Sequence, residues 1–117
     1  MPWRQSLNPG KISFMLKLAW RARKLAAGHH AAVAALKRRR AWLIILAGDA
    51  SPNLKRDILR HAGNCPRVTF LTKNELGAIV GRNEIGVLVV LDQHFARGLI
   101  MELKKDENGG DGSKATG

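Results

Sequence analysis

The 117-residue sequence has one cysteine, no long apolar segment and no acidic residue in its first forty positions. A single thiol, Cys65, excludes a disulfide within the chain. The apolar run 85–91 is far shorter than the roughly 20 residues that a membrane-spanning helix needs. The first five residues lack the apolar segment of a signal peptide. These absences predict a cytoplasmic protein that does not enter a membrane.

Sequence patterns that carry catalysis or cofactor binding are also missing. The chain has no P-loop, no Gly-x-Ser-x-Gly sequence and no paired metal-ligand spacing. His29 and His30 point about 100° apart on a helix and are poorly placed to share an ion. Asp49, which follows an apolar run, is the best single catalytic candidate, although a turn-forming aspartate before a helix explains it equally well. We therefore expect no enzymatic activity, cofactor, metal or small-molecule substrate.

Positive charge is what the chain has in excess. Twenty Lys and Arg face nine acids, which gives a net charge of +11 and an isoelectric point near 11.0. Residues 1–40 contain ten of the basic residues and no acid, whereas residues 41–117 contain ten basic residues and all nine acids. A basic surface of this kind attracts polyanions, so the distribution favours phosphate binding by the N-terminal third.

Two helices are expected in this basic third. Apolar residues recur every three or four positions over 12–26, and Lys17, Arg21 and Lys24 fall on the opposite stripe. Gly28 interrupts the pattern, and a second helix is expected over 29–39. That helix ends in four consecutive cations, Lys37 to Arg40. One or two cations suffice to complement a helix dipole, so four favour contact with nucleic acid.

The rest of the chain alternates strands with helices. Apolar segments predict strands over 41–47, 67–71 and 85–91, and helices over 53–61, 72–81 and 93–103. This alternation predicts an α/β domain with a largely parallel sheet. From Lys104 the composition turns polar and Gly-rich, which predicts a disordered tail over 104–117. The domain would then occupy residues 11–103, after a short extension over 1–10.

Two further side chains are interpreted as structural. Cys65, beside Pro66, lacks an identifiable base and is expected to be a partly buried small side chain. Trp3 or Trp42 could stack on a nucleobase, but a tryptophan that opens a buried strand is more often part of a core.

Three local strings carry a resemblance to a known family. They are Leu18-Ala19-Trp20-Arg21-Ala22-Arg23-Lys24-Leu25 followed by Gly28, the run Ala41-Trp42-Leu43-Ile44-Ile45-Leu46-Ala47-Gly48-Asp49-Ala50-Ser51, and Thr72-Lys73-Asn74-Glu75-Leu76-Gly77-Ala78-Ile79-Val80-Gly81. In this order, over about residues 11–103, they resemble the small ribosomal and kink-turn RNA-binding proteins of the L7Ae/L30e type. The bacterial branch called YlxQ is the most similar.

The resemblance implies a three-layer α/β/α sandwich whose mixed, mostly parallel sheet has four strands, one of them too short for periodicity to place. It also implies binding of structured RNA, ribosomal RNA included, at the start of the second helix and the loop before the last strand. Here these segments are 28–38 and 82–86. Together with the basic stripe they give the candidate RNA-binding residues Lys17, Arg21, Lys24, Gly28, His30, Lys37, Arg38, Arg39, Arg82 and Ile85.

The sequence departs from the family pattern at the positions that recognise bases. Kink-turn binders place Asn, Glu and Lys along the second helix, and the same register here gives His30, Ala31 and Ala34. An alanine side chain cannot hydrogen-bond a base edge. We therefore expect binding mainly through phosphates, by a non-enzymatic protein of the translation apparatus. The alternative is a protein-interaction adaptor that uses the same fold without specific RNA binding.

Overall fold

The structure is a computed structural model that describes residues 9–110, with side chains described for residues 10–104. Helices and strands alternate along the described chain, in the order α1 (Pro9–Arg21), β1 (Leu25–Ala27), α2 (His29–Lys37), β2 (Leu43–Leu46), α3 (Pro52–Ala62), β3 (Arg67–Thr69), α4 (Lys73–Ile79), β4 (Val87–Val90) and α5 (Gln93–Gly110). None of the described helices is both long enough and apolar enough to cross a membrane.

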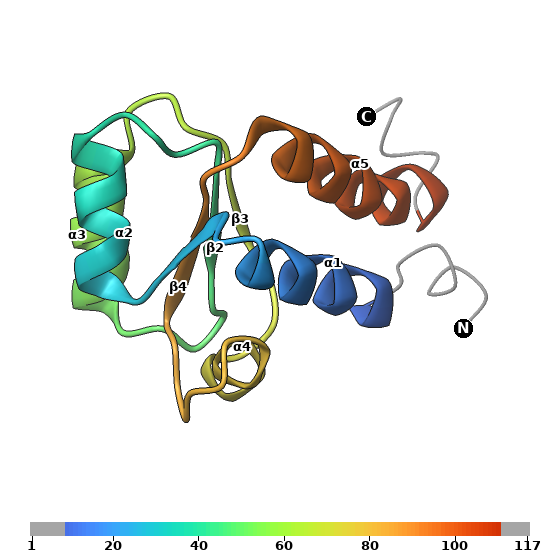
Figure 1. Ribbon diagram of the computed structural model, residues 1–117, viewed down its shortest axis with the longest axis horizontal. Coiled ribbons are helices and arrows are strands. Elements are labelled where there is room, and N and C mark those ends of the chain that lie inside the picture. Colours follow the sequence, from blue (N-terminus) through green and yellow to red (C-terminus); the bar gives the residue numbers. More distant parts are fainter. Residues whose placement is uncertain (1–8, 111–117) are drawn as a thin grey trace.

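The four strands form one mixed sheet between two helical layers. The strand order is β1-β4-β2-β3. Helices α2 and α3 cover one face, whereas α1 and α5 cover the other, with α4 at one end of the sheet (Figure 1). The predicted three-layer α/β/α sandwich with a mixed four-stranded sheet is confirmed.

The prediction of a mostly parallel sheet is wrong. Only β2 and β3 pair in parallel, whereas β4 lies antiparallel to both β1 and β2. The reason is the connection through α4, which has seven residues and stays at the end of the sheet where β3 finishes. The chain re-enters the sheet from that same end, so β4 runs against its neighbours.

Alternating side chains of the central strands fill both layers of the core. Ile44 and Leu46 of β2 pack against α2 and α3, whereas Leu43 and Ile45 pack against α1 and α5. All four are buried. This is the arrangement expected of a continuous apolar strand that is covered on both faces.

The first helix is shorter than predicted, because α1 ends at Arg21 and Leu25 already lies in β1. The N–H of Lys24 donates to the carbonyl of Ala19 (2.8 Å), and that of Arg23 donates to Trp20 (3.0 Å). These two bonds form a Schellman motif, with Arg23 at φ 62° in the left-handed position. Pairing with β4 outweighs the helical periodicity of the segment, so Lys24 does not lie on a helical stripe.

The last helix is longer than predicted, because α5 ends at Gly110 rather than at Leu103. Residues 104–110 are therefore helical, in a segment whose Lys and Glu residues have high helix propensity. The remaining part of the predicted tail, 111–117, and most of the predicted N-terminal extension lie outside the described residues.

The two ends of the sheet carry the segments that contain most of the candidate RNA-binding residues. At one end, called here the Gly28 end, β1, β2 and β3 finish and β4 begins. At the other, called here the Trp42 end, β1, β2 and β3 begin and β4 finishes. The registers fix this assignment, since Ala27 pairs with Leu88 and Leu25 pairs with Val90.

An ion pair ties the start of α2 to α3. The Nε2 atom of His29 lies 2.6 Å from Oδ2 of Asp57, and Arg60 and His61 lie 3.3 and 3.9 Å from Oδ1 of the same carboxylate. The hydrogen bond from His29 lowers the pKa of Asp57 below its usual value, and the charges of Arg60, His29 and His61 lower it further against the effect of desolvation. The charged form of Asp57 is therefore favoured in the folded protein.

The loop before β4 packs on a glycine of α4. A Cβ atom added to Gly77 would lie 2.6 Å from the carbonyl oxygen of Arg82 and 2.7 Å from that of Asn83. The N–H of Arg82 donates to the carbonyl of Gly77 (2.8 Å), and the N–H of Ile85 donates to that of Lys73 (3.0 Å). Only glycine allows this approach, so Gly77 fixes the position of the 82–86 loop.

We predict that Gly77→Ala lowers the melting temperature by several degrees, since overpacking against backbone costs about 1–3 kcal/mol. The sign of the change in stability is decisive, because Gly→Ala in an uncrowded helix stabilises the protein by about 1 kcal/mol. Thermal unfolding measures both effects. Gly48→Ala is the control, since its added Cβ atom would meet its nearest neighbour at an ordinary 3.7 Å. A Gly77→Ala variant as stable as the wild type would contradict the packing.

We predict that Asp57→Asn lowers the melting temperature at neutral pH and that this difference disappears in acid. A carboxylate with a lowered folded pKa stabilises the protein above its unfolded pKa, and the stabilisation is lost as the pH falls through the folded pKa. Melting curves from about pH 7 to about pH 2 test this. Glu84→Gln is the control, since Glu84 forms only an exposed ion pair of 3.9 Å with Lys73. A difference that persists unchanged in acid would contradict the ion-pair account.

Candidate nucleic-acid interface

The start of α2 is an uncapped helix N-terminus at the Gly28 end of the sheet. Gly28 is the N-cap at φ 97°, and no side-chain cap hydrogen bond is found there. Its own N–H donates to the carbonyl of Val87 (3.0 Å), and its carbonyl accepts from the N–H of Ala32 (2.9 Å). The N–H groups of the first helical turn and the helix dipole make such an end suitable for a phosphate.

The loop before β4 lies directly against this helix start. Nη1 of Arg82 contacts the carbonyl of Ala27 at 3.5 Å. A Cβ atom on Gly28 would lie 3.7 Å from Nη1 of Arg82 and 3.9 Å from Cδ1 of Ile85. The structure therefore brings together three of the candidate residues from two segments that are far apart in the sequence. Arg82 is exposed, whereas Ile85 is 5% exposed. The side chain of Ile85 therefore packs in the core and anchors the loop, and Arg82 is the member of the pair that solvent reaches.

The positions that recognise bases in kink-turn binders lie on α2. His30 is exposed, and Ala31 and Ala34 are half-buried. His30 therefore extends into solvent beside Gly28, whereas the two alanines offer only methyl groups. His29, the preceding residue, is held by Asp57 on α3.

The four cations at the end of α2 are far from Gly28. Helix α2 has nine residues, so its two ends are about 13 Å apart. Lys37, Arg38, Arg39 and Arg40 are all exposed. The candidate residues thus divide between the two ends of α2, and the site is not one contiguous patch.

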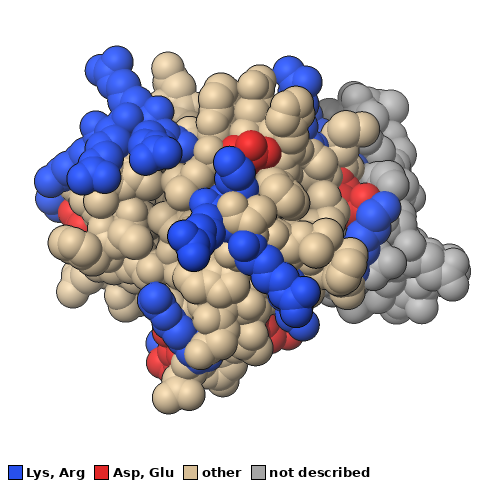
Figure 2. Space-filling view, in the orientation of Figure 1, with Lys and Arg blue, Asp and Glu red and all other residues tan. Residues whose placement is uncertain are grey.

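The basic residues after α1 lie at the Trp42 end as well. The N–H of Leu91 donates to the carbonyl of Lys24, and the N–H of Trp42 donates to that of Val90, each at 2.8 Å. Lys24 and Trp42 therefore flank the end of β4. Figure 2 shows Lys and Arg side chains gathered over the end of α2, at the upper left, and others across the centre of the same face.

Arg23 and Arg40 also belong to this surface. Arg40 is the last of the four consecutive cations that the sequence singles out, whereas Arg23 was not among the candidate residues. Both are exposed. Arg23 lies in the turn that ends α1, and Arg40 follows the turn that ends α2. Lys17, by contrast, lines a groove between α1 and α4 that also includes Glu75, so it is separated from the cations of the Trp42 end.

The other chemically interesting side chains have structural roles. Asp49 accepts a hydrogen bond from the N–H of Lys73 (2.8 Å) at the start of α4, as expected of a turn-forming aspartate. Cys65 is half-buried, as predicted, and burial raises the pKa of its thiol, an effect that the charge of Arg67 offsets only in part. Within the described part of the chain, no group of three potential metal ligands occurs.

Trp42 corrects the sequence interpretation, because its side chain is 45% exposed rather than part of the core. The residue precedes β2 by one position, so its side chain lies beyond the last strand pair rather than between the sheet and a helix. Trp3 lies outside the described residues.

Comparison with known proteins identifies the family of this chain. The model of the Ribosomal protein L7Ae/L30e/S12e/Gadd45 family matches residues 10–99. The RNA-binding protein YlxQ of Bacillus subtilis (strain 168) is 32% identical over 88 residues, which cover 74% of this chain and 88% of that protein. A structure of a protein of unknown function from Bacillus halodurans C superposes with a TM-score of 0.75 at 31% identity, over 80% of this chain and 97% of that one. The chain belongs to the L7Ae/L30e/S12e/Gadd45 family of ribosomal proteins.

Proposed function

We propose that this chain is a non-enzymatic RNA-binding protein of the translation apparatus, and that it holds structured RNA mainly through phosphate contacts. One observation carries the proposal: this chain belongs to a family of ribosomal proteins and has a strongly basic surface. The YlxQ relative bears the name of an RNA-binding protein. The net charge of +11 supports the same class of partner.

The Gly28 end supplies the fixed contact with the RNA. The uncapped start of α2 offers N–H groups to a phosphate, and the guanidinium of Arg82 lies beside Gly28 to neutralise the same charge. The helix start is fixed by the backbone hydrogen bonds of Gly28, and Nη1 of Arg82 contacts the carbonyl of Ala27 at 3.5 Å, so the two groups lie together before RNA binds. His30 adds one exposed donor or a ring that can stack on a base.

The Trp42 end supplies electrostatic attraction. Its exposed cations come from the ends of α1 and α2, and each phosphate that they neutralise releases counterions and makes binding dependent on salt. These interactions carry no base information, so they raise affinity for any RNA of suitable shape. Base-specific recognition of a kink-turn is weak in this proposal, because Ala31 and Ala34 offer no hydrogen-bonding group.

We predict that neutralising Lys37, Arg38 and Arg40 to Gln reduces the salt dependence of RNA binding. The slope of log affinity against log salt falls by up to about 0.9 for each phosphate that the variant no longer neutralises. Anisotropy titrations of a labelled hairpin RNA at several salt concentrations measure this slope. The matched control neutralises three cations of α3, namely Lys55, Arg56 and Arg60. Equal losses in both variants would place the basic surface elsewhere, and no RNA binding by the wild type would favour the protein-adaptor alternative.

We also predict that the wild type binds a standard kink-turn only slightly better than a duplex whose sheared pairs are replaced by Watson–Crick pairs. Restoring the family residues with His30→Asn, Ala31→Glu and Ala34→Lys raises this preference by about 1–3 kcal/mol for each base that a new side chain hydrogen-bonds. Duplex affinity changes little, apart from the effect of the new charges. Paired titrations at fixed salt test both statements, and tight, selective kink-turn binding by the wild type contradicts them.

A further inference from the structure

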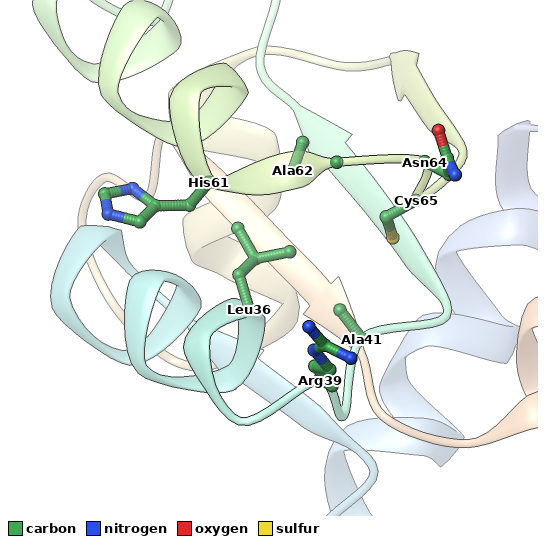
Figure 3. A pocket seen from close by; sticks show the side chains of 8 residues that line it. Leu36, Arg39, Ala41, His61, Ala62, Asn64 and Cys65 are labelled. Atoms are coloured by element: carbon green, nitrogen blue, oxygen red, sulfur yellow. The ribbon is translucent and has the colours of Figure 1, made fainter.

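A pocket of about 520 Å³ opens at the Trp42 end, between the last turns of α2 and α3. Figure 3 shows Leu36 and Arg39 from the end of α2, Ala41 from the following connection and Cys65 from the connection to β3 around the same space. His61 and Asn64 also line it. Its volume lies within the range of small-ligand sites, so it can hold a planar group of the size of a nucleobase.

The wall formed by residues 63–65 is held in place before any ligand arrives. The guanidinium of Arg67 donates from Nη2 to the carbonyl of Gly63 (2.8 Å) and to that of Cys65 (3.0 Å), and from Nε to Cys65 (3.2 Å). Cys65 itself donates its N–H to Ala62 (3.0 Å). The pocket is therefore preformed, which lowers the entropic cost of binding.

Arg39 occupies a backbone position that normally belongs to glycine. Its φ is 57°, and the bonds from Arg39 N–H to Leu36 (3.1 Å) and from Arg40 N–H to Ala35 (3.0 Å) form the Schellman motif that ends α2. Glycine is the usual residue at this left-handed position, because a Cβ atom is unfavourable there. Arg23 occupies the equivalent left-handed position at the end of α1, with φ 62°, so both turns place an exposed arginine at the Trp42 end.

Trp42 lies on the other side of the same strand end. Ala41 lines both the pocket and a second, shallower hollow that contains Trp42 and Arg97 from α5. An exposed tryptophan beside an arginine is a platform on which a base can stack. Asp57 lies one helical turn before the pocket residue His61, and its carboxylate is engaged by His29, Arg60 and His61.

We propose that the Trp42 end binds unpaired nucleotides of the RNA, as a second contact site separate from the Gly28 end. One base enters the pocket against Leu36 and Cys65, its neighbour stacks on Trp42, and the connecting phosphates lie against Arg39 and Arg40. A duplex cannot enter the pocket, because its bases are stacked and paired, so the site distinguishes single strands from helices. The inference rests on the proposed RNA-binding function and adds the class of RNA that this end selects.

Cys65 provides a direct report of occupancy, because it is the only cysteine in the chain and lines the pocket. The test measures the rate at which iodoacetamide alkylates this thiol, at about pH 9, because burial raises the pKa of Cys65 and the thiolate is the reactive form. The probes are a blunt hairpin RNA and the same hairpin with a single-stranded adenosine tail of about six nucleotides. We expect the tailed hairpin to slow alkylation at least about fivefold and to bind about tenfold more tightly than the blunt one.

The decisive variant is Arg39→Gly, which suits the left-handed position and so keeps or raises the melting temperature. It should lose the protection of Cys65 and the difference in affinity between the tailed and the blunt hairpin, while the loss of one cation weakens the binding of both hairpins to the same extent. The control is Arg56→Gln on α3, which should retain both effects.

The outcomes separate this inference from the function on which it rests. Binding of the blunt hairpin without any added protection from the tail overturns the inference and leaves the proposed function standing. Full protection of Cys65 by the tailed hairpin in the Arg39→Gly variant overturns the inference as well. Absence of binding to either hairpin defeats the proposed function together with the inference.

Discussion

Strand β4 is the constraint on which both candidate interfaces depend. It lies between β1 and β2 and runs against them, so its two ends contact the segments that carry candidate RNA-binding side chains. At its start, the carbonyl of Val87 accepts the N–H of Gly28 and fixes the beginning of α2. At its finish, the N–H of Leu91 donates to Lys24 while Val90 accepts from Trp42. A single apolar strand therefore sets the spacing between the two candidate interfaces.

Much of this fold is predictable from the sequence, because strongly apolar and strongly periodic segments determine their own secondary structure. The core strands β2 and β4 follow from continuous apolar runs. Helix α3 begins after Ser51, whose side chain accepts the N–H of Leu54, and α4 begins at a capping box in which the side chains of Thr72 and Glu75 each accept the other's backbone N–H. Strand β1 is not predictable from the sequence, since Leu25–Ala27 is a three-residue segment whose extended form depends on its partner β4. The direction of β4 is not predictable either, because periodicity carries no information about which end of the sheet a strand enters.

The candidate site was less predictable, because it depends on contacts between distant segments. Charge alone identified the cations at the ends of α1 and α2, but it could not tell that they lie about one helix length away from Gly28. The adjacency of Gly28 and Arg82 came from the family resemblance, since nothing local links positions so far apart. The exposure of Trp42 and the pocket beside Arg39 had no sequence signal, because both depend on where a strand ends in three dimensions.

The central claim is that RNA contacts both ends of the sheet and leaves the outer face of α3 free. Backbone amide chemical shifts, recorded by NMR as a tailed hairpin RNA is added, test it most directly, because the amides of both ends of the sheet and of α3 are observed in one experiment. The account predicts shift changes in two groups, at 28–31 with 82–86 and at 23–24 with 37–42, and little change over 53–60. Changes confined to one group, or centred on α3, would contradict it.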